Sequence, residues 1–511
     1  MTIKFDYSDK ATWETFQNGK TVCVFQCESP LVQKWLKKIK PENLWELAAV
    51  VSAVRPGPLL AQMTETYVHN KFFPDKVEKF NHPTIDAILE PTYNVILFQE
   101  QIMDLGKKVA WIDLPENERL IQADVLRKAI GKKSQKAILE IGQKFVEGCL
   151  RNQISQEIAD RLFDLIKKSG RYVFNLSHAV SYAKVAFETA YVKTHYAGDT
   201  FISWMNAANE CQKPLEELDK LVQDSKAWGF TVIGPNVNSR NIKFEKVAPE
   251  QIQYGLGYIK MAGNGITNVI QTLPKITTWQ QIMRLGLTND IVPKLRSPVI
   301  EAMICSCCFR DVNVFRHHLL DVYNILSNIK ERELIYALKQ IDSIGIKDIP
   351  KLIEDIANNI STKGRKQVML SEAQILKSAL NTPESILWIE EQEIKYLGCV
   401  LSPCETQKYE HVSSHNCYEC NNISDYEDIA HINLIGRIDS VFIREIKTGK
   451  NKGKPMAQIS IRDSSGRINN LPVFSETYLK CSADITEKNI VELVMSHRAH
   501  KGFMVKSIRL V

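Results

Sequence analysis

The sequence changes its periodicity near residue 430, and this change restricts the possible folds more than any other feature. Before about residue 380, apolar residues recur at three- and four-residue steps over 42–54, 135–150, 155–168 and 178–196, which predicts amphipathic helices. From residue 431, apolar and polar residues alternate in short runs separated by turn residues, which predicts strands. We therefore expect a multidomain protein that is mainly α, with a C-terminal all-β domain.

The length of 511 residues exceeds one ordinary core, so we expect several domains. Residues 1–228 form the first helical domain, which ends where a short apolar run begins. Residues 229–380 resume helical periodicity with shorter elements, and residues 381–430 have the composition of a linker. Residues 431–511 hold five short strands, a number typical of an OB-fold barrel.

Charge and targeting signals say less about function. The formal net charge of +6 is compatible with a nucleic-acid partner but does not demand one. No apolar run reaches the length of a membrane span, and residues 1–6 do not resemble a signal peptide. We expect a cytoplasmic protein without membrane contact.

Residues 170–182, Gly-Arg-Tyr-Val-Phe-Asn-Leu-Ser-His-Ala-Val-Ser-Tyr, lead into a long helical pattern. Asn175 or Ser177 would cap this helix and leave N–H groups free to bind phosphate. Tyr172, Phe174 and His178 lie beside the same helix end. These parts can seat a nucleotide; the alternative is that the rings only pack in the core.

This segment resembles the Gly-Tyr-Gly-Phe-Asn-Lys-Ser-His motif in the fingers of bacterial C-family replicative DNA polymerases, the DNA polymerase III alpha family. Further segments resemble the same family in the same order: 24–29, 55–58, 93–103, 126–133, 145–148, 255–260 and 396–398. The resemblance implies polymerase fingers over 1–228, a helix-hairpin-helix and clamp-binding-like domain over 229–380, and an OB-fold domain over 431–511.

The resemblance also implies which residues bind the incoming dNTP: Arg127, Lys128, Tyr172, Asn175, Ser177 and His178. Arg127 and Lys128 match a basic pair whose second member is usually arginine, so Lys128 keeps the charge but loses a bidentate fork. Tyr172 and His178 match residues that line the pocket of the nascent base pair.

DNA contacts are implied at Lys132, Lys133, Gly255, Gly257, Lys260, Gly263, Arg437, Lys450, Lys452 and Lys454. The glycine-rich stretch 255–265 resembles the start of a helix-hairpin-helix, where small residues let N–H groups approach phosphates. An ordinary turn is the alternative. In the OB-like domain, Phe442 and Phe474 could stack on single-stranded template beside the lysines. The alternative there is a solvated hairpin with buried rings.

Nucleotide addition needs two metal ions held by acidic residues, and the sequence contains no Asp-x-Asp pair. In the resembled family the catalytic aspartates lie in a palm domain that precedes the fingers, and residue 1 falls near the start of the fingers. We therefore expect no catalytic residue and no metal ligand in this chain. We expect the palm of a partner to bind Mg²⁺. The implied partners are a palm- and thumb-bearing chain, primer–template DNA, dNTP and a sliding clamp, in the host cytoplasm if the source is viral.

Cys399, Cys404, Cys417 and Cys420 have a spacing near that of a zinc ribbon, but the resembled family needs no zinc there, so zinc is not expected.

The sequence predicts the C-terminal subunit of a split DNA polymerase III alpha-like polymerase that positions template and dNTP. The alternative is a non-catalytic DNA-binding accessory protein derived from a polymerase. Two replacements favour it: Val173 stands for the usual glycine and Leu176 for the usual lysine. An RNA-binding OB module would leave the finger segments unexplained.

Overall fold

The computed structural model describes residues 3–131, 135–409, 418–420, 423, 426, 429–447, 451–498 and 502–511. The chain forms two compact units, Met1–Ala197 and Gly198–Val511. The boundary between them falls before residue 228, where the sequence predicts the end of the fingers. Within the described ranges, no helix is both long and apolar enough to cross a membrane.

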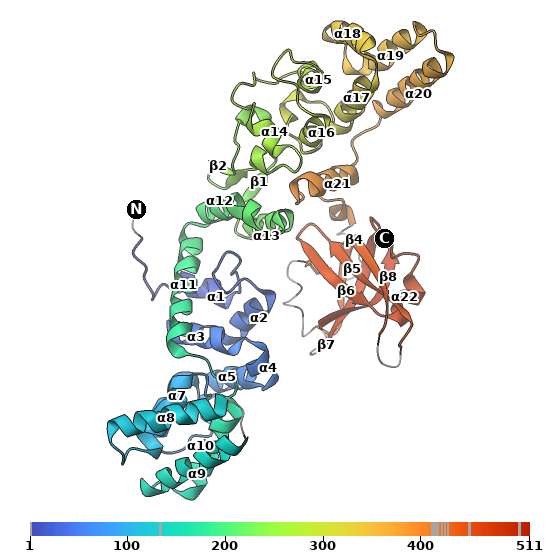
Figure 1. Cartoon of the computed structure of the whole chain (residues 1–511). Coiled ribbons are helices and arrows are strands. Elements are labelled where there is room, and N and C mark those ends of the chain that lie inside the picture. The colour runs from blue at the N-terminus through green and yellow to red at the C-terminus, as the bar shows by residue number, and fades with distance from the viewer. Residues whose placement is uncertain are drawn as a thin grey trace. The chain divides into compact units, whose positions relative to one another are not determined.

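The first unit is helical (Figure 1). Its described α-helices are α1 (Lys10–Gln17), α2 (Pro30–Ile39), α3 (Leu44–Ala53), α4 (Pro56–Leu60), α5 (Met63–Phe72), α6 (Pro83–Leu89), α7 (Gln99–Leu105), α8 (Glu116–Gly131), α9 (Gln135–Arg151), α10 (Gln156–Ser169) and α11 (Leu176–His195). The four periodic stretches coincide with α3, α9, α10 and α11, so these helix predictions are confirmed.

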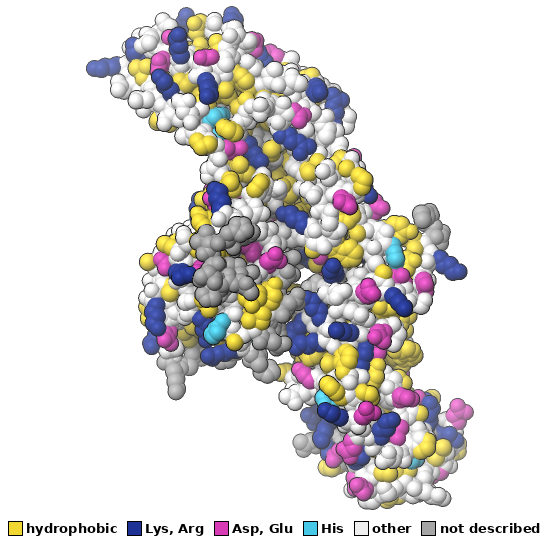
Figure 2. Space-filling view, turned by 180° about the vertical axis from the view of Figure 1, so that it is seen from behind, with side chains coloured by type: hydrophobic (Ala, Val, Ile, Leu, Met, Phe, Trp, Pro, Cys, Tyr) yellow, Lys and Arg dark blue, Asp and Glu magenta, His cyan; other side chains and the backbone are white. Residues whose placement is uncertain are grey.

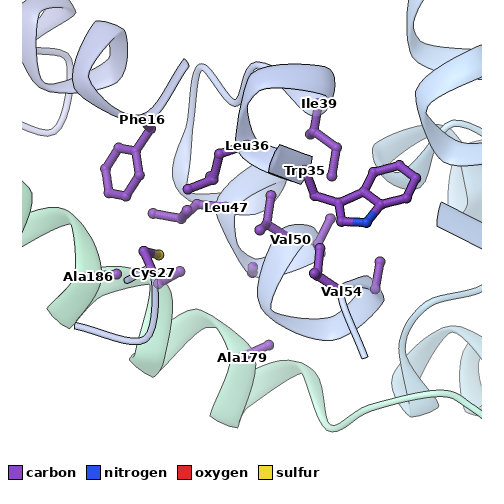
Figure 3. Close-up of a cluster of buried hydrophobic side chains, with 14 of the residues drawn as sticks. Phe16, Cys27, Trp35, Leu36, Ile39, Leu47, Val50, Val54, Ala179 and Ala186 are labelled. Atoms are coloured by element: carbon purple, nitrogen blue, oxygen red, sulfur yellow. The ribbon is translucent and has the colours of Figure 1, made fainter. Parts of the chain in front are cut away.

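One hydrophobic cluster holds α11 against the N-terminal helices. Ala179, Ala183, Ala186 and Ala190 form a fully buried stripe of small side chains on α11. Small residues allow close helix approach, and α3 packs on this stripe. Figure 3 shows Leu47 of α3 above the alanines, with aromatic and aliphatic side chains of α1 and α2 closing the cluster. This cluster fixes the direction in which the start of α11 points.

A second cluster lies among α6, α7, α8, α9 and α10. Leu126, Ala129 and Ile130 of α8 are buried in it. Because these three residues occupy the inner face of α8, Arg127 and Lys128 are left on its outer side, and Arg127 is only partly exposed. The hydrophobic period of the helix therefore places the predicted basic pair at the surface.

The second unit begins with helices and a small sheet. Its described α-helices are α12 (Ala197–Ala207), α13 (Pro214–Ala227), α14 (Gly263–Thr267), α15 (Trp279–Leu287), α16 (Ser297–Cys305), α17 (Arg316–Asn328), α18 (Glu331–Gln340), α19 (Ile349–Asn358), α20 (Lys363–Ala379), α21 (Ile386–Leu397) and α22 (Ser475–Cys481). Strand β3 (Gln251–Gln253) pairs in parallel with β1 (Thr231–Ile233) and antiparallel with β2 (Glu245–Ala248). Helix α21 lies inside the segment that the sequence assigns to a linker, and its Glu390 and Glu393 are buried.

The C-terminal sheet confirms the predicted strands. The strands β4 (Ile432–Glu445), β5 (Pro455–Arg462), β6 (Arg467–Val473), β7 (Ile490–Arg498) and β8 (Gly502–Leu510) form an antiparallel sheet in the order β6-β5-β4-β7-β8. Helix α22 lies between β6 and β7 in the chain. In the part of the sheet that the structure describes, no ladder joins the edge strands β6 and β8. Closure into an OB barrel therefore stays a prediction.

A buried ion network ties this sheet to the preceding helices. The carboxylate of Asp439 accepts from Arg437 Nη2 at 3.1 Å and from Arg462 Nε at 3.0 Å. Arg437 Nη1 also donates to Glu390 of α21 at 2.7 Å, and Arg462 donates to Asp219 of α13 at 3.0 Å. Both guanidiniums are buried, so each needs its carboxylates to compensate for lost hydration.

We predict that Asp439→Ala lowers the free energy of unfolding by about 3 kcal/mol, because two buried cations lose a shared anion. Urea unfolding followed by circular dichroism measures the change. Glu476→Ala is the matched control, since its ion pair with Lys480 is exposed and contributes less than about 1 kcal/mol. Equal stability of the two variants would contradict a structural role for the network.

Candidate nucleotide-binding site

A short backbone bridge joins the loop before α11 to the start of α7. The N–H of Phe174 donates to the carbonyl oxygen of Leu97 at 2.9 Å, and the N–H of Gln99 donates to the carbonyl oxygen of Phe174 at 2.9 Å. Phe98 and Phe174 form the corresponding parallel bridge. The structure thereby brings together two of the segments that carry the family resemblance.

Side chains of the loop alternate between the two hydrophobic clusters. Tyr172 and Phe174 pack against the cluster around α11, whereas Val173 packs against the cluster around α8. Val173 does not have a positive φ, so its backbone conformation does not require glycine. The replacement of glycine by valine is therefore accommodated by burial of its side chain.

Asn175 caps α11, and it is one of the two caps, Asn175 or Ser177, that the sequence predicts. Its side-chain oxygen accepts from the N–H of His178 at 2.9 Å and from the hydroxyl of Ser177 at 2.7 Å. The helix end is less open than expected, because Glu100 occupies part of it. The carboxylate of Glu100 accepts from the N–H of Leu176 at 2.9 Å and from Nδ2 of Asn175 at 3.0 Å.

Glu100 corrects the expectation of a helix end with its N–H groups free for phosphate. A carboxylate is favourable at a helix N-terminus for the same electrostatic reason as a phosphate. Of the first three N–H groups of α11, only that of Ser177 has no protein acceptor among the described residues. Glu100 lies within the family segment 93–103, but the residues around it in the sequence do not show which helix its carboxylate contacts.

Aromatic rings line the exposed side of the first turns of α11. The ring centroids of His178 and Tyr182 lie 4.1 Å apart, and Phe174 meets His178 edge-on at 5.3 Å. Phe25 contacts Tyr182 from another segment at 5.2 Å. His178 is exposed, so this cluster offers a ring on which a base can stack.

The basic pair of α8 shares one carboxylate. Asp124 accepts from Arg127 Nη2 at 2.7 Å and pairs with Lys128 Nζ at 2.6 Å. Hydrogen bonds from Lys128 and Arg127 hold the pKa of Asp124 below its usual value. Arg127 Nη1 also reaches Oε1 of Gln99 at 3.4 Å. Gln99 therefore links the basic pair to the bridge and to the rings.

An apolar cavity of about 560 Å³ lies beside this helix end. Trp45, Pro91 and Phe98 line it, together with Glu100 and Leu176. Leu176 stands where the resembled family has a lysine, and here it contributes apolar surface to the cavity. The position is thus used for packing instead of for phosphate.

Tyr172 is positioned by the segment 55–58. A Cβ atom added to Gly57 would lie 2.6 Å from Cδ1 of Tyr172, so the ring packs directly on the glycine backbone. Only glycine permits this approach. Two family segments that are far apart in the chain therefore meet at the tyrosine.

The residues predicted to bind DNA fall into different environments. Lys452 and Lys454 are exposed on the hairpin between β4 and β5. Phe442 is 63% exposed and Phe474 is 40% exposed, as stacking on bases requires. Arg437 is 4% exposed and belongs to the ion network, which removes it from a DNA-binding surface. Lys132, Lys133 and Lys450 lie outside the described residues.

The glycine-rich turn is explained by packing within the chain. A Cβ atom added to Gly255 would lie 2.6 Å from the carbonyl carbon of Lys243, and one added to Gly257 would lie 3.0 Å from the carbonyl oxygen of Ile242. A Cβ atom added to Gly263 would lie 2.3 Å from the carbonyl oxygen of Gly257. Close backbone contacts thus account for these three glycines. Lys260 is exposed, and its N–H donates to the carbonyl oxygen of Tyr396 at 2.9 Å.

Cysteine and clamp-related positions complete the predicted set. Cys399, Cys404 and Cys420 are buried, and Cys417 lies outside the described residues. Among the residues that the structure describes, no group of three or more His, Cys, Asp or Glu side chains could hold a metal ion. In the predicted clamp-binding-like domain, residues 367–371 lie inside the helix α20.

Surface charge alone does not locate the site. Figure 2 shows Lys and Arg side chains interspersed with Asp and Glu over one face of the molecule. The assignment therefore depends on local geometry and on relatives.

Comparison with known proteins identifies the relatives of the chain. Residues 2–153 match the family described as bacterial DNA polymerase III alpha subunit finger domain. The chain is 31% identical over 320 residues to the DNA polymerase III subunit alpha of Aquifex aeolicus, which covers 62% of this chain. The Vibrio cholerae protein of the same name is 29% identical over 77% of this chain, and that of Buchnera aphidicola is 27% identical over 96%.

The chain is similar to bacterial DNA polymerase III alpha subunits over the regions that match. It spans only part of these relatives: the matched regions cover 26% of the Aquifex, 34% of the Vibrio and 40% of the Buchnera alpha subunit. The match to the finger domain includes Glu100 and Arg127 and ends before Tyr172. The loop at 172–178 is therefore attached to the finger domain by the bridge to residues 97–99.

We predict that Gly57→Ala lowers the free energy of unfolding of the first unit by about 1–3 kcal/mol, because the new methyl group displaces the packed Tyr172 ring. Thermal unfolding followed by circular dichroism measures this. The control is Gly131→Ala, where an added Cβ meets nothing within 4 Å. An unfolding curve of Gly57→Ala that matches the wild type would rule out this packing constraint.

Proposed function

We propose that this chain positions primer–template DNA and the incoming deoxynucleotide for DNA-directed DNA synthesis. The observation that carries the proposal is the bridge between residues 97–99 and Phe174, which places Arg127, the α11 helix end and the His178 ring on one connected frame. Holding the reactants in line for attack supplies a large share of the catalytic effect in phosphoryl transfer.

The assignments within this frame follow from chemistry. His178 would stack on the base of the incoming dNTP, and Tyr172 would support the loop by packing on the cluster around α11. Arg127 and Lys128 would release the carboxylate of Asp124 and bind phosphate oxygens in its place. Asn175 acts by holding the helix end, since its side-chain oxygen already accepts two hydrogen bonds. Ser177 contributes its N–H.

The catalytic carboxylates and Mg²⁺ belong, in this proposal, to a palm that lies outside these 511 residues. Asp-x-Asp is missing from the sequence, and no group of acidic residues within the described ranges suits a metal ion. We propose that a separate palm- and thumb-bearing chain supplies them, which makes this chain one part of a split polymerase. A sliding clamp is a further proposed partner.

The C-terminal domain would hold single-stranded template. Support comes from the exposed lysines of the β4–β5 hairpin and from the exposed ring of Phe442 on β4. Ring stacking over a cationic strand surface is the usual chemistry of sequence-independent binding to single strands. The antiparallel order β6-β5-β4-β7-β8 of the five strands is compatible with an OB fold.

A second candidate function is a DNA-binding accessory protein without a role in synthesis. Two observations favour it: Asp124 occupies both members of the basic pair, and Glu100 occupies the start of α11. Both carboxylates stand where phosphate would bind.

Primer extension with the palm-bearing chain of the same genome distinguishes the two functions. We expect extension from the mixture of both chains, and a fall in kcat/KM of about tenfold or more for Arg127→Ala and for His178→Ala, since each loses a charged hydrogen bond or a stacking contact. Arg151→Ala is the control, because Arg151 pairs with Asp113 on the surface. No extension, or extension that neither variant changes, would favour the accessory function.

Binding to single-stranded DNA tests the C-terminal domain separately. We expect Lys452→Gln with Lys454→Gln to weaken binding and to lower the slope of log affinity against log salt by about 0.7 for each lysine lost. Fluorescence anisotropy at several salt concentrations measures both quantities. Lys488→Gln removes an equal charge whose partner is Glu391 and should leave the slope unchanged. An unchanged slope in the double variant would place the DNA elsewhere.

A further inference from the structure

Arg55 is a rigidly held cation beside the candidate site. Its Nε donates to the carbonyl oxygen of Ser52 at 2.9 Å, and its Nη2 donates to the carbonyl oxygen of Tyr172 at 3.0 Å. Its Cζ lies 4.3 Å from the centre of the Phe174 ring. Two hydrogen bonds and one ring contact therefore fix the plane of the guanidinium.

No anion among the residues that the structure describes compensates the charge of Arg55. Within the described ranges, no carboxylate lies at ion-pair distance from it, and its Nη1 donates to no protein atom. Burial lowers the pKa of the Arg55 guanidinium, although an arginine keeps its charge at neutral pH. The side chain is partly exposed, so a ligand can reach it.

Three other buried or partly buried arginines of the chain, in contrast, contact carboxylates. Arg316 donates to Glu393 at 2.9 Å, and Arg437 and Arg462 each contact two carboxylates. A partly buried guanidinium without such a partner loses part of its hydration and gains no Coulomb energy in return. A preformed cation of this kind is suited to bind an anion that arrives from outside.

We propose that Arg55 binds a phosphate group of the incoming nucleotide through its free Nη1 edge. The same loop that accepts its hydrogen bond carries the Phe174 and His178 rings, so the base and the phosphate would be bound from one frame. Arg127 must first exchange its hydrogen bonds to Asp124 for bonds to phosphate, whereas Arg55 pairs with no carboxylate in the described part of the chain. This inference rests on the proposed function, because it assigns a nucleotide to the site.

The first test is equilibrium dialysis of the full 511-residue chain with labelled dATP in magnesium-free buffer, with tripolyphosphate as competitor. We expect saturable binding that tripolyphosphate displaces, and an affinity about tenfold weaker for Arg55→Gln. Arg55→Lys should lose less, because it keeps the charge but not the fork. Arg151→Gln, a surface arginine of the same unit, should bind like the wild type.

Comparing deoxyadenosine with dATP distinguishes a phosphate contact of Arg55 from a purely structural role of this residue. If Arg55 only holds the loop, Arg55→Gln weakens deoxyadenosine and dATP by the same factor; a phosphate contact weakens dATP and tripolyphosphate selectively. Thermal unfolding of each variant reports whether the loop remains packed. Equal losses for both ligands would overturn the proposal. So would the absence of saturable dATP binding by the wild type up to about 5 mM, already a weak affinity.

Binding of single-stranded oligo(dT) shows whether the phosphate that Arg55 contacts belongs to the nucleotide or to the DNA backbone. If Arg55→Gln weakens oligo(dT) binding and leaves dATP binding unchanged, Arg55 contacts the DNA backbone and the proposal is wrong. Failure of the Arg55 proposal is distinguishable from failure of the proposed polymerase function. Primer extension that proceeds normally with Arg55→Gln would leave that function intact without Arg55. dATP binding without any primer extension would count only against the polymerase function.

Discussion

The candidate site depends on two backbone hydrogen bonds between residues 97–99 and Phe174. They hold an extended loop between two hydrophobic clusters, with Tyr172 and Phe174 packed on one cluster and Val173 on the other. Because the loop is fixed on both sides, the first turn of α11 can point only in one direction. The rings, the helix end and the basic pair of α8 acquire their mutual geometry from this arrangement.

Local chemistry explains what the sequence could predict. Periodicity of 3.6 residues identified α3, α9, α10 and α11, and residue preferences at helix caps left Asn175 and Ser177 as candidates, of which Asn175 is the cap. Alternation identified the strands of the C-terminal sheet. Each of these properties depends on neighbours within a few residues, so one segment of sequence contains all the information that is needed.

Contacts between distant segments explain what the sequence could not predict. Glu100 meets α11 across 75 residues, and Arg437 meets Glu390 across 47 residues. Composition shows Arg437 as one basic residue among several on a strand, and only the packing of α21 against the sheet makes it a buried ion-pair partner. The same limitation applies to Arg55, whose proposed role depends on the three-dimensional finding that no described carboxylate pairs with it.

The electrostatics of the site then determine where a phosphate gains most. At the start of α11 and at Arg127, the positive groups already contact Glu100 and Asp124. A phosphate that binds there replaces one anion with another, so the gain is only the difference between two charge-assisted interactions. At Arg55 the guanidinium is partly buried and oriented by carbonyl oxygens, and no anion among the described residues has to be displaced. In the proposed complex, a single arginine that pairs with no described carboxylate can therefore contribute more to nucleotide affinity than either member of a basic pair that already shares one carboxylate.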